Sequence, residues 1–180
     1  MFDLSGKIAL VTGGSRGIGK ASAVLLARQG ARVIITYAKD EAAARQTVEA
    51  IEAAGGAAEA ERLDVGSFEQ TESTVAAIAK RAGKLDILVA NAGISIDALL
   101  LRLREQDLDA ILSVNVKGAI ACAQGAIKSM LRAKSGRIIF VSSVVGQMGN
   151  AGQVAYAASK AGLIGAAKSL AREYLSLIHI

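Results

Sequence analysis

The chain has 180 residues, of which 52% are hydrophobic and 21% charged, and its net charge is +5. This composition excludes an intrinsically disordered chain and fits one domain with a sizeable core. A single cysteine, Cys122, and a single histidine, His179, exclude a disulfide framework, a multi-cysteine metal site and catalysis that needs several imidazoles.

The charge pattern and the N-terminus argue against membrane and nucleic-acid partners. The longest uncharged stretch, 138–159, carries several hydroxyl and amide side chains and is too polar to span a bilayer. The first residues lack the basic and then apolar layout of a signal peptide. Basic residues are scattered, without the interleaved aromatic residues that favour nucleic acid. We therefore expect a cytoplasmic protein that binds neither membranes nor nucleic acid.

Strands and helices are predicted to alternate along the chain. Short apolar runs predict strands, and longer runs rich in alanine and charged residues predict the helices between them. The expected strands are 7–12, 32–36, 57–63, 85–90 and 137–141. The expected helices are 17–29, 41–54, 67–82, 107–133 and 154–174. Ser67, with Gln70 three residues later, is expected to cap the third helix.

This alternation predicts the fold class. Strands that are apolar on both faces favour a parallel sheet covered by helices on two sides. With right-handed crossovers, the result is a doubly wound α/β fold of three layers, of the Rossmann type. No linker or internal repeat divides the chain.

The first chemical motif follows the first expected strand, in the segment Thr12–Gly19. Gly13 allows a tight turn, Gly17 lets the backbone approach a pyrophosphate, and Gly19 lets helix and sheet pack closely. The free N–H groups of the following helix would face the phosphates. Glycine spacing alone is a weak signal, but between a strand and a helix it favours a nucleotide site over a turn without ligand.

The second strand bears on which dinucleotide is bound. Its end, Ile35–Lys39, carries no acid that would bind the adenine ribose of NAD. Asp40 and Glu41 come later and are expected to begin a helix. Arg16 and Lys39 could both reach a 2′-phosphate, which favours NADPH. Taken alone, Lys39 would more simply be a solvated surface side chain.

Two further strand ends are expected to face the same crevice. Asp64, followed by Val65, could accept a hydrogen bond from an adenine amino group, or could simply lead into the next helix. Asn91, Ala92 and Gly93 end the fourth strand, where small residues leave room for a cofactor. Asn91 could equally cap the turn.

The second motif consists of Tyr156 and Lys160, which lie four residues apart on an expected helix and so share a face. An ammonium favours the phenolate form of a nearby tyrosine, as acid–base chemistry requires, and Lys160 could also hold a nicotinamide ribose. Taken alone, such a pair is more often an ordinary pair on a helix surface.

Two polar residues strengthen the second motif. Ser143, at the end of the fifth strand, could donate a hydrogen bond to a substrate carbonyl oxygen. Asn115 lies in the middle of an expected helix, where asparagine is unfavourable. It could distort the helix and hold a water against Lys160, or it could be an exposed polar residue.

Together, the glycine motif, Asn91–Gly93, Asn115, Ser143 and the Tyr156–Lys160 pair resemble the short-chain dehydrogenase/reductase family over about residues 7–173. The resemblance implies NADPH-dependent reduction of a 3-oxoacyl thioester on acyl carrier protein to its 3-hydroxyacyl form, in fatty-acid synthesis. It also implies a homotetramer, and a basic segment, 132–134, that faces the carrier protein.

The resemblance further implies a role for each site residue. Tyr156 would donate the proton to the carbonyl oxygen, Ser143 would polarise that oxygen, and Lys160 would assist the tyrosine and grip the ribose. Asn115 would anchor a proton-relay water, and Gln153 would lie near the substrate. The cofactor would be bound by Gly13, Ser15, Arg16, Gly17, Ile18, Gly19, Lys39, Asp64, Val65, Asn91, Ala92 and Gly93, together with Tyr156 and Lys160.

The C-terminal part departs from the family. Members carry further strands and a substrate-covering loop after the helix with the Tyr–Lys pair, whereas 174–180 does not resemble them. We expect one domain over 1–173 that lacks the last strands, with the fifth strand as an open edge. Two alternatives stay open: a short-chain reductase of a CoA thioester, sugar or small ketone, and an inactive nucleotide-binding fragment.

Overall fold

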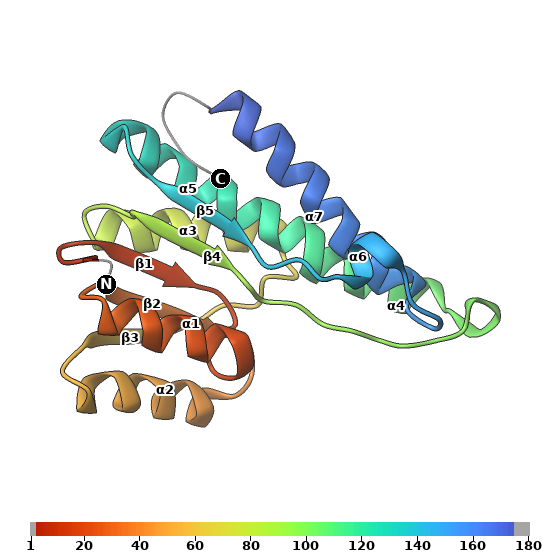
Figure 1. Ribbon diagram of the computed structural model, residues 1–180, viewed down its shortest axis with the longest axis horizontal. Helices are drawn as coiled ribbons and strands as arrows, with labels where there is room; N and C mark the ends of the chain where they lie inside the picture. The colour runs from red at the N-terminus through yellow and green to blue at the C-terminus, as the bar shows by residue number, and fades with distance from the viewer. Residues whose placement is uncertain (1–2, 175–180) are drawn as a thin grey trace.

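Five parallel strands form the middle layer of the computed structural model, which describes residues 3–174 (Figure 1). Their order across the sheet is β3-β2-β1-β4-β5. Strands β2 and β3 therefore lie on one side of β1, and β4 and β5 lie on the other, with the topological switch point between β1 and β4. The predicted doubly wound α/β fold is confirmed. The strands are β1 (Ile8–Val11), β2 (Arg32–Tyr37), β3 (Ala57–Arg62), β4 (Ile87–Ala90) and β5 (Arg137–Phe140).

Helices cover both faces of this sheet (Figure 1). Val11 and Ile35 pack on the side of α1 (Gly17–Arg28) and α2 (Glu41–Ala53). Leu10 and Ile34 pack on the side of α3 (Phe68–Arg81) and α5 (Ala119–Ala133). The alternation follows from the two-residue period of a strand. On the α5 side, α7 (Val154–Glu173) extends the layer, and its Leu163 packs near the end of β4.

The long helix expected over 107–133 is interrupted. It consists of α4 (Glu105–Leu112), a π-helical segment Ser113–Gly118, and α5. The π-helical segment contains Asn115, which agrees with the distortion considered for that residue. A Cβ on Gly118 would lie 2.6 Å from the Val65 carbonyl oxygen, so the segment packs closely against the loop after β3. A π-helical turn of this kind often marks a functional site.

Local details agree with the sequence-based expectations in part. Ser67 is the N-cap residue of α3, as expected, but its side chain makes no capping hydrogen bond. Asp40 does begin α2, since its Oδ1 accepts a 2.9 Å hydrogen bond from the Ala43 N–H. Two short helices were not predicted: η1 (Leu100–Arg102) and α6 (Val145–Met148).

Among the described residues, one helical run, Glu105–Ala133, is long and apolar enough to cross a membrane by length and composition. In this fold 56% of its most apolar window is buried inside the protein. Its residues Ala123, Ala126 and Met130 belong to the core between the sheet and α3. The run is therefore a core helix.

β5 is the edge strand of the sheet within residues 3–174, where it pairs only with β4. Ile139 pairs in register with Val89, faces the α1 side of the sheet, and is 49% exposed. The open apolar edge is thus confirmed for the described part of the chain. The expected boundary at residue 173 stays a prediction, because 175–180 lie outside the described residues.

Candidate active site

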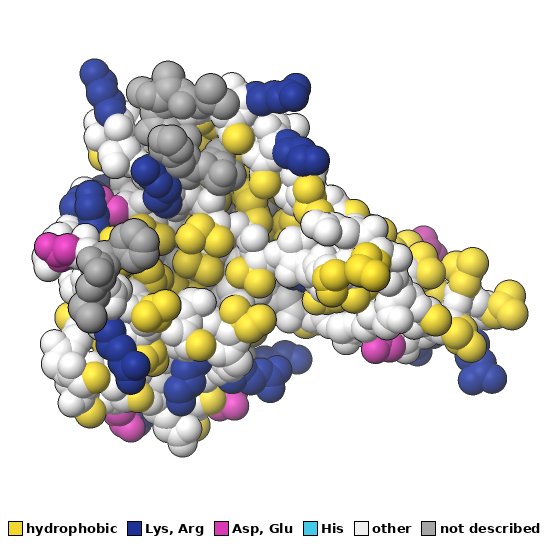
Figure 2. All heavy atoms as spheres, viewed as in Figure 1, with side chains coloured by type: hydrophobic (Ala, Val, Ile, Leu, Met, Phe, Trp, Pro, Cys, Tyr) yellow, Lys and Arg dark blue, Asp and Glu magenta, His cyan; other side chains and the backbone are white. Residues whose placement is uncertain are grey.

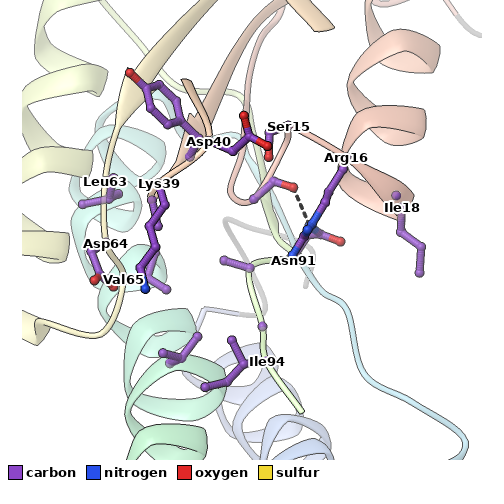
Figure 3. A pocket seen from close by; sticks show the side chains of 17 residues that line it. Ser15, Arg16, Ile18, Lys39, Asp40, Leu63, Asp64, Val65, Asn91 and Ile94 are labelled. Atoms are coloured by element: carbon purple, nitrogen blue, oxygen red, sulfur yellow. Dashed lines mark hydrogen bonds between the residues drawn. The ribbon is translucent and has the colours of Figure 1, made fainter. Parts of the chain in front are cut away.

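The carboxyl ends of β1, β2, β3 and β4 border a pocket with a volume of about 870 Å³ (Figure 3). Open α/β sheets bind ligands at these carboxyl ends of their strands. Of the residues expected to bind a cofactor, all line this pocket except Gly19, Tyr156 and Lys160. Residues from four separate strand ends are therefore brought together as the sequence predicted.

The glycine turn between β1 and α1 has the backbone that its sequence requires. Gly13 and Gly17 have φ angles of +65° and +55°, which residues with a side chain rarely adopt. A Cβ on Gly17 would meet no atom within 4 Å, so its backbone is open to the pocket. Arg16 begins α1 without a side-chain cap, which leaves the first N–H groups of the helix available for an anion.

A threonine that sequence reasoning missed ties this turn to β4. Thr12 is buried, and its Oγ1 accepts hydrogen bonds of 3.1 Å from the N–H groups of Asn91 and Ala92. In return, Asn91 Nδ2 donates to the carbonyl oxygens of Thr12 and Gly13, at 2.9 and 3.2 Å. Asn91 therefore stabilises the turn and also lines the pocket, and its contact with a cofactor stays a prediction.

Arg16 and Lys39 reach the pocket from different elements, the first from the start of α1 and the second from the end of β2 (Figure 3). Within residues 3–174 neither forms a salt bridge. Both cationic groups are thus available to an anionic ligand. The neighbouring acid, Asp40, is occupied as the cap of α2, and Asp64 Oδ1 accepts a 3.0 Å hydrogen bond from the Gly66 N–H.

Tyr156 and Lys160 share a face of α7, beside the pocket and not among the residues that line it. Lys160 Nζ lies 5.7 Å from the centroid of the Tyr156 ring and donates a 2.7 Å hydrogen bond to the Val141 carbonyl oxygen. Lys160 is 5% exposed, and burial lowers the pKa of its ammonium group. A Cβ on Gly93 would lie 3.5 Å from Nζ, so this ammonium adjoins the pocket wall.

Two serines after β5 lie near this pair. Ser143 is half-buried, and its Oγ accepts a 3.2 Å hydrogen bond from the Val145 N–H, which leaves its hydroxyl hydrogen free to donate. Ser142, which sequence reasoning missed, donates through Oγ to the Lys160 carbonyl oxygen at 2.7 Å. The end of β5 is therefore fixed directly to α7 at Lys160.

Asn115 is buried, with 1% exposure, so the interpretation of it as an exposed polar residue is wrong. Its Oδ1 accepts from the Ile94 N–H at 2.8 Å, and its Nδ2 donates to the Ile94 carbonyl oxygen at 2.9 Å and to Ser159 Oγ at 3.0 Å. The side chain thus joins the π-helical segment, the loop after β4, and α7. Its role in holding a relay water stays a prediction.

Gln153 and the basic segment 132–134 lie at the periphery. Gln153 Nε2 donates to both carboxylate oxygens of Asp97, at 3.1 and 3.2 Å, and so fixes the loop after β4 to the start of α7. Hydrogen bonds from Ser95 and Gln153 lower the pKa of Asp97. The segment 132–134 spans the end of α5 and precedes β5. It therefore lies near the amino ends of the strands, away from the carboxyl ends that border the pocket.

Replacing Gly19 by Ala is expected to lower the melting temperature and to weaken nucleotide binding. A Cβ at this position would collide with the Gly13 carbonyl oxygen and lie 2.5 Å from Asn91 Nδ2, so the glycine turn would have to move. Overpacking of this kind costs about 1–3 kcal/mol. Thermal unfolding with and without NADPH measures both effects.

The matched control is Gly165→Ala on α7, where an added Cβ meets no atom within 4 Å. This change should stabilise the protein by roughly 0.5–1 kcal/mol, because alanine suits a helix interior better than glycine. If Gly19→Ala and Gly165→Ala had the same melting temperature and the same NADPH affinity, the close packing at Gly19 would be unimportant for stability and binding.

Comparisons with known proteins identify the family of this chain. A family model described as short chain dehydrogenase matches residues 7–179. A 3-oxoacyl-[acyl-carrier-protein] reductase of Synechocystis is 43% identical over 176 residues, which cover 98% of this chain and 71% of that protein. The reductase of the same name from Vibrio cholerae is 46% identical over 175 residues, which cover 97% of this chain and 70% of that protein.

A solved short-chain dehydrogenase from Burkholderia cenocepacia, in complex with NADP, is similar to this chain with a TM-score of 0.91 and 44% identity. The match covers 97% of this chain and 71% of that one. The family model, the relatives and the five-stranded fold agree with one another, and the chain belongs to the short-chain dehydrogenase family.

Proposed function

We propose that this chain is the core of an NADPH-dependent reductase that converts a 3-oxoacyl thioester on acyl carrier protein to the 3-hydroxyacyl form. The names of the relatives from Synechocystis and Vibrio cholerae support this substrate. One structural observation carries the proposal. The pocket wall at Gly93 adjoins Lys160, on the same face of α7 as Tyr156.

The residues of the pocket fit a phosphate-bearing dinucleotide. The open backbone at Gly17 and the uncapped start of α1 suit a pyrophosphate, and Arg16 and Lys39 suit a 2′-phosphate. The similar Burkholderia protein was solved in complex with NADP. When bound, NADPH supplies the hydride for the reduction.

The residues of α7 and of the loop after β5 would handle the proton. Tyr156 donates its phenolic proton to the carbonyl oxygen, and the Lys160 ammonium stabilises the phenolate that this leaves. Lys160 Nζ has three N–H donors and uses one on Val141, so others stay available to a ribose hydroxyl. Ser143 donates its hydroxyl hydrogen to the same carbonyl oxygen and stabilises the developing charge.

The oligomeric state is part of the same proposal. Figure 2 shows apolar side chains gathered at the tip of the molecule beyond α4, where Leu99, Leu100 and Leu101 are 63%, 68% and 100% exposed. Met148 on α6 is 79% exposed. These surfaces support self-association, in keeping with a cytoplasmic homotetramer, which size-exclusion chromatography with light scattering would test.

NADPH oxidation with four substrates tests the function. The proposal predicts turnover of acetoacetyl-acyl-carrier-protein above that of acetoacetyl-CoA, and of both above a small ketone and a sugar. A preference for a sugar or small ketone would assign the chain to another short-chain reductase. NADPH binding without turnover of any carbonyl substrate would indicate a nucleotide-binding fragment.

Replacing Arg16 or Lys39 by Ala is expected to weaken NADPH binding by about tenfold each and to leave NADH binding unchanged. A hydrogen bond to a charged group contributes roughly 1.5–3 kcal/mol, and NADH lacks the 2′-phosphate that would receive it. Fluorescence titration with both cofactors measures the effect. The control is Lys80→Ala, which removes one exposed charge on α3 outside the pocket. Equal losses with both cofactors would contradict the assignment of these side chains.

A further inference from the structure

Ser159, which no part of the proposed reaction uses, lies between the groups of the candidate site. It is on α7 directly before Lys160, and its side chain is completely buried, with 0% exposure. Its Oγ donates a 2.7 Å hydrogen bond to the Tyr156 carbonyl oxygen and accepts a 3.0 Å hydrogen bond from Asn115 Nδ2. A single hydroxyl therefore connects the π-helical segment to the turn of α7 that carries Tyr156 and Lys160.

This connection extends to the wall of the pocket. Asn115 holds both backbone polar groups of Ile94, the residue after Gly93, at 2.8 and 2.9 Å. Ile94 itself lines the pocket. The result is a continuous series of hydrogen bonds from Ile94 through Asn115 and Ser159 to the Tyr156 carbonyl oxygen. We call this series of hydrogen bonds the Ile94–Tyr156 link.

A serine that bonds only to its own helix would not need this environment. Ser73 on α3 makes the same local contact, since its Oγ donates to the Gln70 carbonyl oxygen three residues earlier, at 3.1 Å. Ser73 is exposed and, within residues 3–174, has no hydrogen bond to another element. The additional feature at Ser159 is the contact with Asn115, forty-four residues away in the sequence.

We propose that Ser159 is a positioning residue, which sets the placement of Tyr156 and Lys160 relative to the pocket wall through the Ile94–Tyr156 link. This inference deepens the proposed function and rests on it for the consequence in catalysis. The expected consequence is a fall in kcat when the link is cut, because a small misplacement of a reacting group slows a reaction strongly. Substrate and cofactor affinity should change little, since Ser159 is fully buried and does not line the pocket.

The test compares Ser159→Ala with Ser73→Ala in two measurements. The first is amide hydrogen exchange in the peptides covering 91–96 and 156–162, which needs no activity. Ser159→Ala should raise exchange at least about fivefold in both peptides, because the link holds Ile94 as well as α7. Ser73→Ala should leave both peptides unchanged. A rise confined to 156–162 would show a merely local role and would overturn the proposal.

The second measurement separates kcat from KM in NADPH oxidation with an acetoacetyl thioester. Ser159→Ala is expected to lower kcat about tenfold, with KM for both substrates within about twofold of the original. If the original chain reduces the thioester and Ser159→Ala has the same kcat, the positioning role is contradicted. If the original chain turns over no carbonyl substrate, the proposed function fails, and hydrogen exchange still decides whether the link exists.

Should Ser159→Ala fail to fold, Ser159→Cys provides a second variant of similar size. A thiol is a weak donor and acceptor, so it should weaken the link without emptying the space. Exchange in both peptides should then lie between the values expected for serine and alanine. Exchange equal to that of the original chain would overturn the proposal.

Discussion

Tyr156→Phe is expected to lower the rate of carbonyl reduction by about 10²–10⁴-fold, because this is the usual contribution of a positioned acid or base. The phenolic oxygen is the only atom removed. The ring would keep its place on α7, 5.7 Å from Lys160 Nζ. NADPH binding should fall far less than the rate, because the other residues expected to bind the cofactor, eleven of which line the pocket, stay unchanged.

Steady-state NADPH oxidation and fluorescence titration measure these two quantities separately. The matched control is Tyr174→Phe, which removes the same hydroxyl from a side chain that packs against the core at the end of α7. This control should keep the full rate. A Tyr156→Phe variant that also kept it would remove Tyr156 from the reaction, and a different proton donor would then have to be sought near Ser143.

Lys160→Met is expected to have the second largest effect, a fall in kcat of about 10²–10³-fold, as found when one preorganised charged or polar donor is removed from an active site. Methionine keeps much of the length of the side chain but removes the ammonium beside the phenol. NADPH affinity should also fall, because the N–H groups proposed to reach the ribose are lost. Steady-state kinetics and titration measure both quantities. Lys168→Met, on an exposed part of the same helix, is the control for loss of one positive charge.

The stability of Lys160→Met should depend on pH in a defined direction. Burial lowers the pKa of Lys160 below its ordinary value of 10.5. At a pH below both pKa values the ammonium is present in the folded and the unfolded state, and its full desolvation penalty opposes folding. As the pH rises toward 10.5, the folded state releases this proton first, so the original chain gains stability relative to Lys160→Met.

Urea unfolding at neutral pH and near pH 10.5 checks this direction. Loss of the hydrogen bond to Val141 offsets part of the relief at neutral pH, so we expect the two proteins to have similar free energies of unfolding there. The difference in unfolding free energy should then move in favour of the original chain at the higher pH. The opposite movement would mean that the Lys160 ammonium is stabilised by its surroundings.

The fold was accessible from the sequence because its signals are local. Apolar runs such as Val33–Ile35 specify buried parallel strands, and the glycine spacing in Thr12–Gly19 requires backbone angles that the structure shows at Gly13 and Gly17. Strand ends of a doubly wound sheet meet at one edge. The pocket could therefore be predicted from residues that are far apart in the sequence.

The supports of the site could not be predicted, because they depend on hydrogen bonds between elements. The hydroxyls of Thr12, Ser142 and Ser159 bond to backbone or amide atoms that lie 18 to 80 residues away. Ser159 also bonds to the neighbouring turn of its own helix. No periodic pattern distinguishes such hydroxyls from ordinary ones. The π-helical segment around Asn115 is similar, since it depends on the contacts of Asn115 with Ile94 and of Gly118 with Val65.

We infer that the pocket at the strand ends and the Tyr156–Lys160 face of α7 form one active site. A crystal structure of this chain with NADP bound would decide this. We expect the pyrophosphate against the backbone of Ser15–Gly19, the adenine beside Asp64, and the nicotinamide between Gly93 and Tyr156. A nicotinamide ring directed away from the phenolic oxygen, or a nucleotide bound outside the pocket, would contradict it.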